Sequence, residues 1–417
     1  TRHLHLHRRR RGGGHFFRPS GKPNSECLMS DEMIQPMPDS DYILLLPTEL
    51  RKLIPVFRNT STSAARLVEK LRRCSGLMPR PVRRGCSDGC GVQQRLVVEV
   101  RRMKFHHGEI APSPSKPVAC ISFGPTVAAD GDEHITDCCL SALAGLNSDC
   151  LLTLFALIQM ASEHNGIIAD NITEVGRRRG WPPSKLDNRS RSTTRTRRER
   201  LRGHIALLSE VEFLITDLAD ERGAYVAFPL LVFMLRQGEQ GPPRQNQLLY
   251  QFHPLLWNDM TVRQRAVLID KELLKADPQR DEWLLRLAWY MGSRWAPSWV
   301  SKSLDQRGGR LTERLGVMLA GSCIECADQL RHQGRKWLRR RFRDAMDRLV
   351  NWSPRSLIGG YEIAEDPAAP LEDWVTFWPT ETVADRLTAA RTQAIASREA
   401  RNHRSRSRGR TKRSKDK

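Results

Sequence analysis

Apolar residues recur at helical spacing along the middle of the chain, starting near residue 147. Residues 151–158 are apolar except for Thr153, and Ser148 and Asp149 just before them supply capping chemistry. This pattern predicts a core helix that is buried on nearly all sides. A short second helix is predicted over residues 172–178, and the glycine and prolines at 180–183 stop it.

A third helix follows this loop, and it carries separate apolar and basic faces. Leu201, Ile205 and Leu208 lie on one side, while arginines fill another side at helical spacing. The period then changes to two over residues 211–215, and residues 225–232 are predicted to return as a strand. Two helices, a basic helix and a hairpin follow the order of a winged-helix domain.

The same order of elements recurs toward the C-terminal end of the chain. Helices are predicted over residues 282–295, 311–320 and 335–350, and strands over 358–363 and 375–378. The last of these helices has a full apolar stripe, which consists of Leu338, Phe342, Ala345, Met346 and Leu349. The pattern therefore predicts two units of one architecture, without obvious sequence identity between them.

The segments outside these units predict a mixture of elements. Residues 42–75 are predicted to be helical, residues 96–100 to form a strand, and the proline-rich residues 106–135 to form a connector. Between the two units, residues 248–257 are predicted to form a strand and a turn, and residues 262–274 a helix.

The expected fold class is mainly α with small β-hairpins, an α+β arrangement, and the chain divides into six segments. The segments are a disordered basic leader and linker (1–40), a small N-terminal α/β region of unknown role (41–140), a first winged-helix domain (147–240), a connector (241–281), a second winged-helix domain (282–380), and a helix running into a basic disordered tail (381–417).

Basic residues are concentrated at the two ends of the chain. Its 417 residues include 68 Lys and Arg against 47 Asp and Glu, which gives a formal net charge of +21. Residues 1–18 contain six arginines and no acid, but residues 1–28 resemble leader or read-through sequence, with Met29 or Met33 as the expected start. Residues 398–417 contain ten Lys and Arg against two acids. We interpret this tail as a phosphate-binding arm, and a solubilising tail without a partner is the alternative.

Several classes of protein are excluded by what the sequence lacks. The longest apolar run, at 151–158, is far shorter than the roughly 18 residues that span a bilayer. No export signal is visible, so reduced cysteines are expected, and Cys323 and Cys326 are interpreted as buried thiols rather than zinc ligands. No G-x-x-x-x-G-K-[ST] loop occurs, and no catalytic set is ordered by the sequence. We therefore expect neither enzyme activity, nor a cofactor, nor a metal site.

The two basic helices are the main candidate site. A helix can dock into the major groove of DNA when one face is apolar and the other offers donors to phosphates and base edges. An ordinary solvated face is the alternative interpretation. The loop at 180–193 is longer than the turn of roughly three or four residues usual between such helices, and its cations are expected to lie along the DNA backbone. The predicted DNA-binding residues are Arg195, Arg197, Arg198, Arg202, Arg335, Lys336, Arg339, Arg340 and Arg343.

The layout over residues 147–380 resembles the replication initiator proteins of bacterial plasmids, which carry tandem winged helices. The matching stretches are 194–218, where a basic helix runs into Leu-Leu-Ser-Glu-Val-Glu-Phe-Leu-Ile, and 308–361, where a second basic helix leads into Ile-Gly-Gly-Tyr. The match rests on pattern rather than on a diagnostic motif. It implies binding to repeated duplex sites at a replication origin, local opening of the duplex, and recruitment of host replication proteins.

We therefore expect a cytoplasmic protein that binds double-stranded DNA sequence-specifically and acts as a plasmid-type replication initiator without catalysis. Its expected partners are duplex DNA, host replication proteins and a second copy of itself. We expect no contact with a membrane. The first alternative is a winged-helix transcription regulator with the same DNA contacts. The second is an RNA-binding or scaffold protein that acts through its basic ends.

Overall fold

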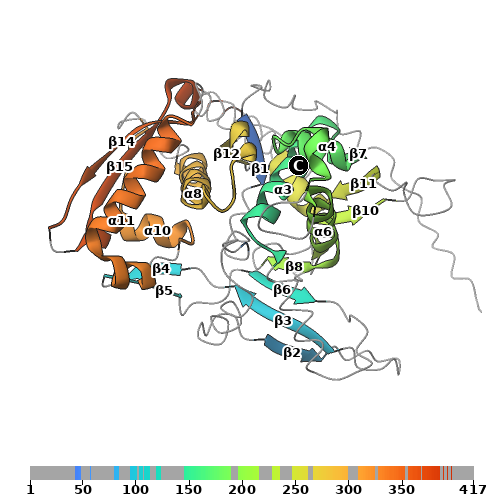
Figure 1. Cartoon of the computed structure of the whole chain (residues 1–417), viewed down its shortest axis with the longest axis horizontal. Coiled ribbons are helices and arrows are strands. Elements are labelled where there is room, and N and C mark those ends of the chain that lie inside the picture. Colours follow the sequence, from blue (N-terminus) through green and yellow to red (C-terminus); the bar gives the residue numbers. More distant parts are fainter. Residues whose placement is uncertain are drawn as a thin grey trace, which may run out of the picture. The chain divides into compact units, whose positions relative to one another are not determined.

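The computed structural model combines helices with small antiparallel sheets, which confirms the expected α+β class (Figure 1). Within the described part of the chain, no helix combines the length and the apolar character needed to cross a bilayer. The structure describes residues 43–47, 57, 79–83, 94–100, 103–106, 108–112, 119–123, 145–188, 196–215, 228–234, 247–261, 266–298, 309–324, 327–352, 356–367, 369–385, 388, 392 and 396.

The first unit comprises the described residues between 147 and 252. Its elements are α3 (Ser148–Glu163), β7 (Ile167–Asn171), α4 (Ile172–Arg178), α5 (Pro183–Leu186), α6 (Arg197–Glu210), β8 (Glu212–Ile215), β9 (Phe228–Pro229), β10 (Leu231–Phe233) and β11 (Gln247–Phe252). Strand β11 pairs with both β7 and β10, so the sheet order is β10-β11-β7. The sheet therefore takes in a strand that lies beyond residue 240, where the sequence places the end of the domain.

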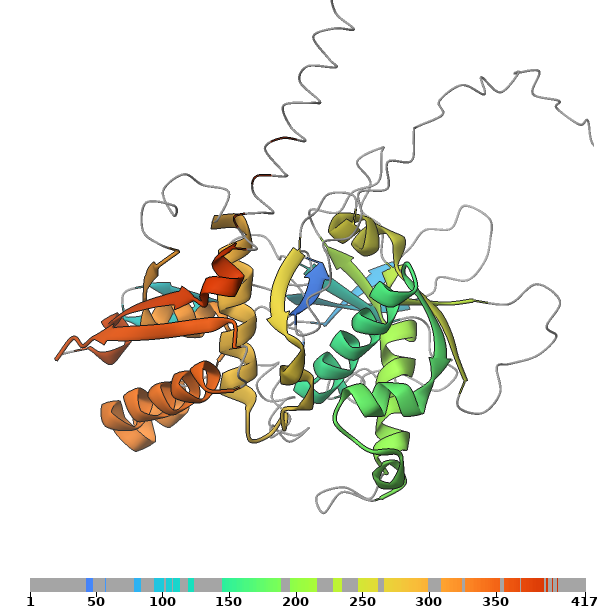
Figure 2. The same cartoon turned by 90° about the horizontal axis from the view of Figure 1, so that it is seen from above.

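The second unit comprises the described residues between 282 and 379. Its elements are α8 (Glu282–Ser298), β13 (Leu311–Arg314), α10 (Leu315–Gly321), α11 (Ala327–Val350), β14 (Ile358–Ala364), the 3-10 helix η4 (Pro370–Glu372) and β15 (Trp374–Pro379). Strand β15 pairs with β13 and β14, and the β14–β15 hairpin lies beside α11 (Figure 2). Both units contain, in this order, a helix, a strand, further helices and an antiparallel strand pair, and in both the last strand is the middle strand of its three-stranded sheet. In the first unit, β8 and β9 come between α6 and that pair and belong to a separate five-stranded sheet.

The hydrophobic pattern does not reveal two of the strands in these sheets, β7 and β13. The helix predicted over residues 311–320 is wrong in its first part, because Leu311–Arg314 form β13 and only Leu315–Gly321 are helical. The strand β7 is likewise short and lies directly before a helix, α4. In each case a distant strand supplies the hydrogen-bonding partners, and the local periodicity of the sequence contains no record of that strand.

Two further helix predictions are corrected by one pair of strands. The helix predicted over 42–75 is wrong at its start, because Ile43–Pro47 form β1; residues 63–74 lie outside the described residues. The helix predicted over 262–274 is wrong as well, because Ala266–Asp270 form β12 and a 3-10 helix, η3 (Lys271–Lys275), follows. Strands β1 and β12 pair with each other across more than two hundred residues, so neither could be recognised locally.

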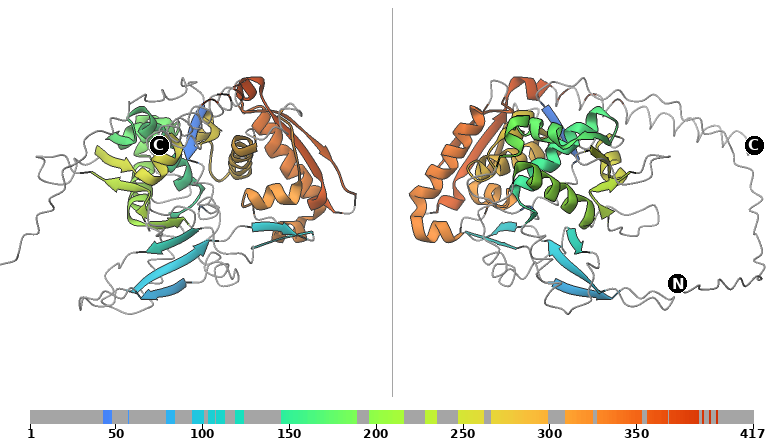
Figure 3. Two further views of the ribbon diagram at one scale, coloured as in Figure 1. Left: turned by 180° about the vertical axis from the view of Figure 1, so that it is seen from behind. Right: turned by 45° about the vertical axis from the view of Figure 1, so that its right-hand side comes forward.

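The proline-rich segment predicted as a connector contains strands. A five-stranded sheet has the order β2-β3-β6-β8-β9, and β4 pairs with β5 (Figure 3). The strands are β2 (Pro79–Arg83), β3 (Gln94–Val100), β4 (Met103–His106), β5 (Glu109–Pro112), β6 (Ala119–Phe123), β8 (Glu212–Ile215) and β9 (Phe228–Pro229). The strand predicted at 96–100 is confirmed as part of β3. The hairpin predicted after the first basic helix is confirmed only in the β8–β9 pair, because the described part of the predicted returning strand, 225–232, divides into β9 and β10, which belong to different sheets.

Close packing of α8 against β12 gives a prediction about stability. A methyl group on Gly292 of α8 would overlap the main-chain oxygen of Leu268, whereas a methyl group on Gly203 of α6 would meet no atom within 4 Å. Gly292→Ala should therefore lower the free energy of unfolding by about 1–3 kcal/mol. Gly203→Ala is the matched control and should raise it by roughly 0.5–1 kcal/mol through helix propensity. Urea denaturation measures both, and a stabilising Gly292→Ala would contradict this packing.

Candidate nucleic-acid interface

Helix α6 begins at a complete capping box. The Thr196 hydroxyl accepts a hydrogen bond from the Glu199 amide at 3.2 Å, and the Glu199 carboxylate accepts one from the Thr196 amide at 2.6 Å. Leu201, Ile205 and Leu208 are all buried, as the apolar spacing predicts. The helix therefore has a fixed start and a fixed inner face, which sets the direction of its arginines.

The predicted arginines of α6 have different environments. Arg202 is exposed, and Arg197 is half-buried. Arg198 donates to both carboxylate oxygens of Asp187, which follows α5, at 2.7 and 3.1 Å. Arg195 lies outside the described residues. The structure thus places Arg198 in an ion pair within the fold and leaves Arg202 at the surface of the same helix.

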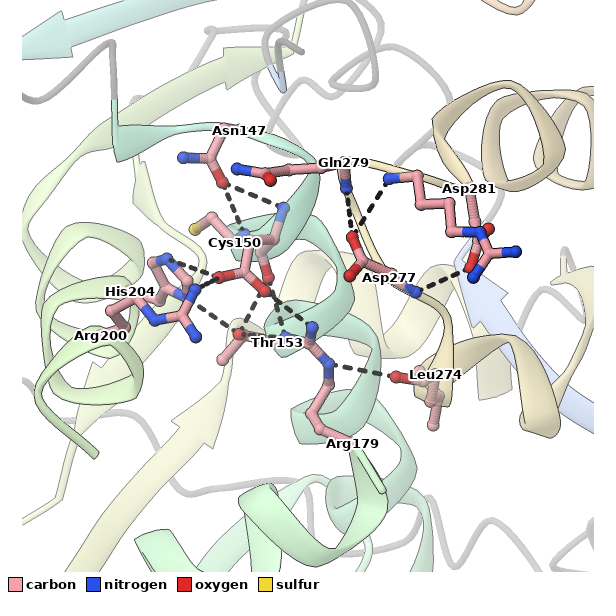
Figure 4. Close-up of polar contacts among 12 residues, drawn as sticks. Asn147, Cys150, Thr153, Arg179, Arg200, His204, Leu274, Asp277, Gln279 and Asp281 are labelled. Atoms are coloured by element: carbon pink, nitrogen blue, oxygen red, sulfur yellow. Dashed lines mark hydrogen bonds and ion pairs between the residues drawn. The ribbon is translucent and has the colours of Figure 1, made fainter. Parts of the chain in front are cut away.

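A buried arginine holds the helices of the first unit together (Figure 4). Arg179, which caps the C-terminus of α4, is 1% exposed. Its guanidinium donates to the Asp149 carboxylate at 2.7 Å, to the Asp149 carbonyl at 3.1 Å and to the Thr153 hydroxyl at 3.1 Å, all on α3. A fourth bond, at 3.1 Å, reaches the carbonyl of Leu274 in η3. Since a buried charge is tolerated only with such partners, this network fixes where α4 ends.

Helix α6 contributes two side chains to the same network. Nδ1 of His204 lies 3.0 Å from the Thr153 hydroxyl, and Arg200 donates to Asp149 at 3.3 Å. Burial lowers the pKa of His204 to about 4, and the nearby guanidinium groups oppose protonation as well. Burial, the largest single influence, would raise the pKa of Asp149, but Arg179, through its charge and its hydrogen bond, and the neighbouring His204 and Arg200 together hold that pKa below its usual value. At neutral pH the network therefore contains an ionised Asp149 and a neutral His204.

The loop that leaves α4 places an indole ring next to these arginines. The Gly180 amide donates to the Arg177 carbonyl at 2.9 Å, and the Trp181 amide donates to the Gly176 carbonyl at 2.8 Å. These two bonds form a Schellman motif, with Gly180 in the left-handed region at a φ of 69°. The motif determines the position of Trp181. The guanidinium carbons of three arginines lie over its ring, at 4.6 Å for Arg179, 5.2 Å for Arg197 and 5.4 Å for Arg200.

The basic part of α11 is a separate helix within that element. Gly334 has a φ of 77° and a ψ of 179°, so the helical backbone is interrupted there and begins again at Arg335, where the sequence predicts the helix to start. The predicted apolar stripe is confirmed, since Leu338, Phe342, Ala345, Met346 and Leu349 are all buried. Four of the predicted cations are exposed: Arg335, Lys336, Arg340 and Arg343.

Two of the predicted cations of α11, Arg339 and the exposed Arg343, form ion pairs with the acidic loop, which we define as residues 365–373 between β14 and β15. Arg339 donates to both carboxylate oxygens of the fully buried Asp373, at 2.7 and 2.8 Å, and its guanidinium lies 3.3 Å from the Glu365 carboxylate. Arg343 forms an ion pair with Glu365. The structure therefore gives Arg339 a role in fixing the hairpin to α11, which the sequence does not indicate.

Sequence reasoning also missed the residues that orient α6. Residues 180–183 are predicted only as a helix stop, although a glycine followed by an apolar residue after a helix is the signature of the Schellman motif. Asp149 is predicted as a capping residue, whereas the cap of α3 is the Asn147 side chain, which accepts from the Asp149 and Cys150 amides. The carboxylate of Asp149 is thereby available to Arg179. No sequence signal links Asp149 to Arg179, because they lie 30 residues apart.

Comparisons with known proteins add little to these geometric findings. No protein-family model matches the chain, and no curated protein matches it. A solved structure, described as "Crystal structure of SeMet derivatives of domain2 and domain 3 of RctB", shares 14% sequence identity with this chain at a TM-score of 0.37. The match covers 74% of this chain and 95% of that one. A TM-score this low assigns neither a fold nor a function.

The buried His204 gives a prediction about pH. Its pKa is about 6.5 in the unfolded chain and about 4 in the fold, so only the unfolded state gains a proton as the pH falls between these values. The stability from this group is complete above pH 6.5 and is lost progressively down to pH 4, a loss on the order of 3 kcal/mol.

Urea denaturation across this pH range measures the loss. His204→Gln should unfold with a shallower pH dependence than the unmodified protein, because the substitution removes the buried titrating ring. His164→Gln is the control, since His164 is an exposed residue at the C-terminal cap of α3. Equal pH profiles for His204→Gln and the unmodified protein would contradict the buried, neutral state of His204.

Proposed function

We propose that the chain is a double-stranded DNA-binding protein with two winged-helix units, in which α6 and α11 enter the major groove. The observation that carries the proposal is the shared order of a helix, a strand, further helices and an antiparallel strand pair whose last strand lies centrally in the sheet, with β8 and β9 inserted before that pair in the first unit. In both units the last helix before the hairpin is the basic one, and its inner face is apolar and buried. A helix of this kind satisfies the requirements for docking in DNA.

The environments of the arginines divide the predicted DNA-binding residues into two groups. Arg202, Arg335, Lys336 and Arg340 are exposed and are our candidates for direct contact with phosphates or bases. Arg198, Arg339 and Arg343 are in ion pairs, so we assign them a role in orienting α5 and the acidic loop. Arg195 remains a prediction from the sequence.

Within this class we propose a plasmid-type replication initiator that binds repeated origin sites and promotes local opening without catalysis. Host replication proteins and a second copy of the chain are its proposed partners, and the cytoplasm its proposed location. A transcription regulator would use the same helices on a single promoter site. The two functions are distinguished by testing the selected duplex for direct repeats and for permanganate-reactive thymines beside them, which an initiator requires and a regulator lacks.

The DNA-binding proposal predicts the effect of removing cations from α11. Substitution of Arg335, Lys336 and Arg340 by alanine should weaken binding of the full chain to a selected duplex on the order of 100-fold and lower the slope of log affinity against log salt by up to about 3. Fluorescence anisotropy across a salt series measures both quantities.

A charge-matched control keeps this test specific. Alanines at Arg177, Lys275 and Arg280 remove the same charge from α4, η3 and the turn that follows η3, and should change the affinity little. Equal losses from both triple variants would mean that only net charge matters. Loss of binding on removal of residues 398–417, with no effect of the α11 variant, would favour the scaffold alternative.

The ion pairs of the acidic loop lead to a second prediction about the affinity for duplex DNA. Glu365 neutralises Arg343 and lies near Arg339, so it competes with DNA phosphates for these guanidinium groups. Glu365→Gln should raise the duplex affinity several-fold at low salt and steepen the salt dependence by up to about 1. Glu362→Gln is the control, because it removes the same charge from an exposed position on β14. An identical gain from both variants would show that the ion pairs do not compete with DNA.

A further inference from the structure

The three arginines around Trp181 use their hydrogen-bonding capacity to very different extents. Arg179 directs four bonds to groups within the fold, so it has a structural role. Arg200 makes one bond, to Asp149, while its Nε is buried and has no acceptor in the described part of the chain. Arg197 contacts the indole ring, and no carboxylate among the described residues pairs with it. The unused donors therefore belong to Arg200 and Arg197, both on α6.

The three guanidinium charges around Trp181 are also only partly balanced by carboxylates. Arg179 and Arg200 share a single carboxylate, that of Asp149, and the neutral His204 adds no charge. The carboxylate of Asp187 pairs with Arg198, and that of Glu199 accepts from the Thr196 amide at the start of α6. Among the described residues, Asp149 is therefore the one carboxylate that pairs with any of the three guanidinium groups around the ring. Such an excess of cationic donors fits an oxyanion, and a guanidinium binds phosphate oxygens in a planar, two-pronged geometry.

We propose that Trp181, Arg197 and Arg200 form a phosphodiester-binding site, in which Arg197 contacts a backbone phosphate of duplex DNA and Trp181 is the positioning residue. The inference rests on the proposed DNA-binding function and deepens it. The indole face attracts a guanidinium placed over it, and this attraction restricts the rotation of the long arginine side chain before DNA arrives. Because the Schellman motif fixes Trp181 to the end of α4, the position of Arg197 is determined by the fold of the first unit.

The site should contribute affinity without sequence preference. A phosphate is present at every step of the duplex, so contacts to it position the protein and carry no base information. Loss of the site should therefore weaken binding to selected and random duplexes by the same factor. A loss confined to the selected duplex would assign Arg197 to a base edge and would overturn the phosphodiester assignment.

A double-mutant cycle in the full chain tests the positioning role of Trp181. Trp181→Leu should weaken duplex binding about fivefold, the value of a cation–π contact of about 1 kcal/mol, and Trp181→Phe should retain most of the affinity. In an Arg197→Ala background, Trp181→Leu should have little further effect. In an Arg202→Ala background, its full effect should persist, since Arg202 lies on α6 but not over the ring. Equal effects of Trp181→Leu in both backgrounds would overturn the proposal.

A second measurement observes the unmodified protein directly and needs a variant only to assign one signal. In the NMR spectrum of the unmodified protein, the Nε–Hε signal of Arg197, identified by its loss in Arg197→Ala, should be shielded by the indole ring. The signal should move when duplex DNA is added. An unshifted Arg197 signal, with other arginine signals responding to DNA, would overturn this inference alone. No response of any signal to any duplex would overturn the proposed DNA-binding function as well.

Discussion

A guanidinium group that is withdrawn from water must find acceptors inside the fold, and Arg179 meets that constraint with four hydrogen bonds. Its partners lie on α3 and η3, while its own main chain ends α4, so three elements are fixed by one side chain. The position of Arg179 also determines that of the next two residues, Gly180 and Trp181, through the Schellman motif. The ring of Trp181 then determines where the first arginines of α6 lie. The geometry of the candidate DNA-binding surface in the first unit thus derives from a buried ion pair.

The second unit fixes its basic helix by a different route. There the arginine belongs to α11 itself, and the buried carboxylate of Asp373 lies in the acidic loop before β15. The helix and the hairpin are consequently joined, and the acidic loop that joins them lies beside the helix. The two units therefore share a topology and differ in electrostatics. The start of α6 has an excess of cations, whereas part of the charge of α11 is neutralised, which is consistent with unequal contributions of the two units to binding.

The sequence predicted the helices α3, α4, α6, α8 and the second part of α11 well, but it also predicted helices where the short strands β1, β12 and β13 lie. Leu201, Ile205 and Leu208 on α6, and the stripe from Leu338 to Leu349 on α11, are buried as their spacing requires, because a helix is a local structure. Strands β1, β7, β12 and β13 depend on partners far along the chain, which no local pattern records. The candidate site shows the same limit. A run of arginines can be counted in the sequence, but the distant carboxylate that will neutralise one of them cannot be identified there.

The central claim is that α6 and α11 bind duplex DNA through their exposed cationic faces. Hydrogen–deuterium exchange of the full chain, with and without a selected duplex at physiological salt, tests it most directly. The account predicts slower amide exchange in residues 180–188 and 196–203 of the first unit and in residues 334–343 of the second. Slower exchange confined to residues 398–417, with unchanged rates in both helices, would contradict the account.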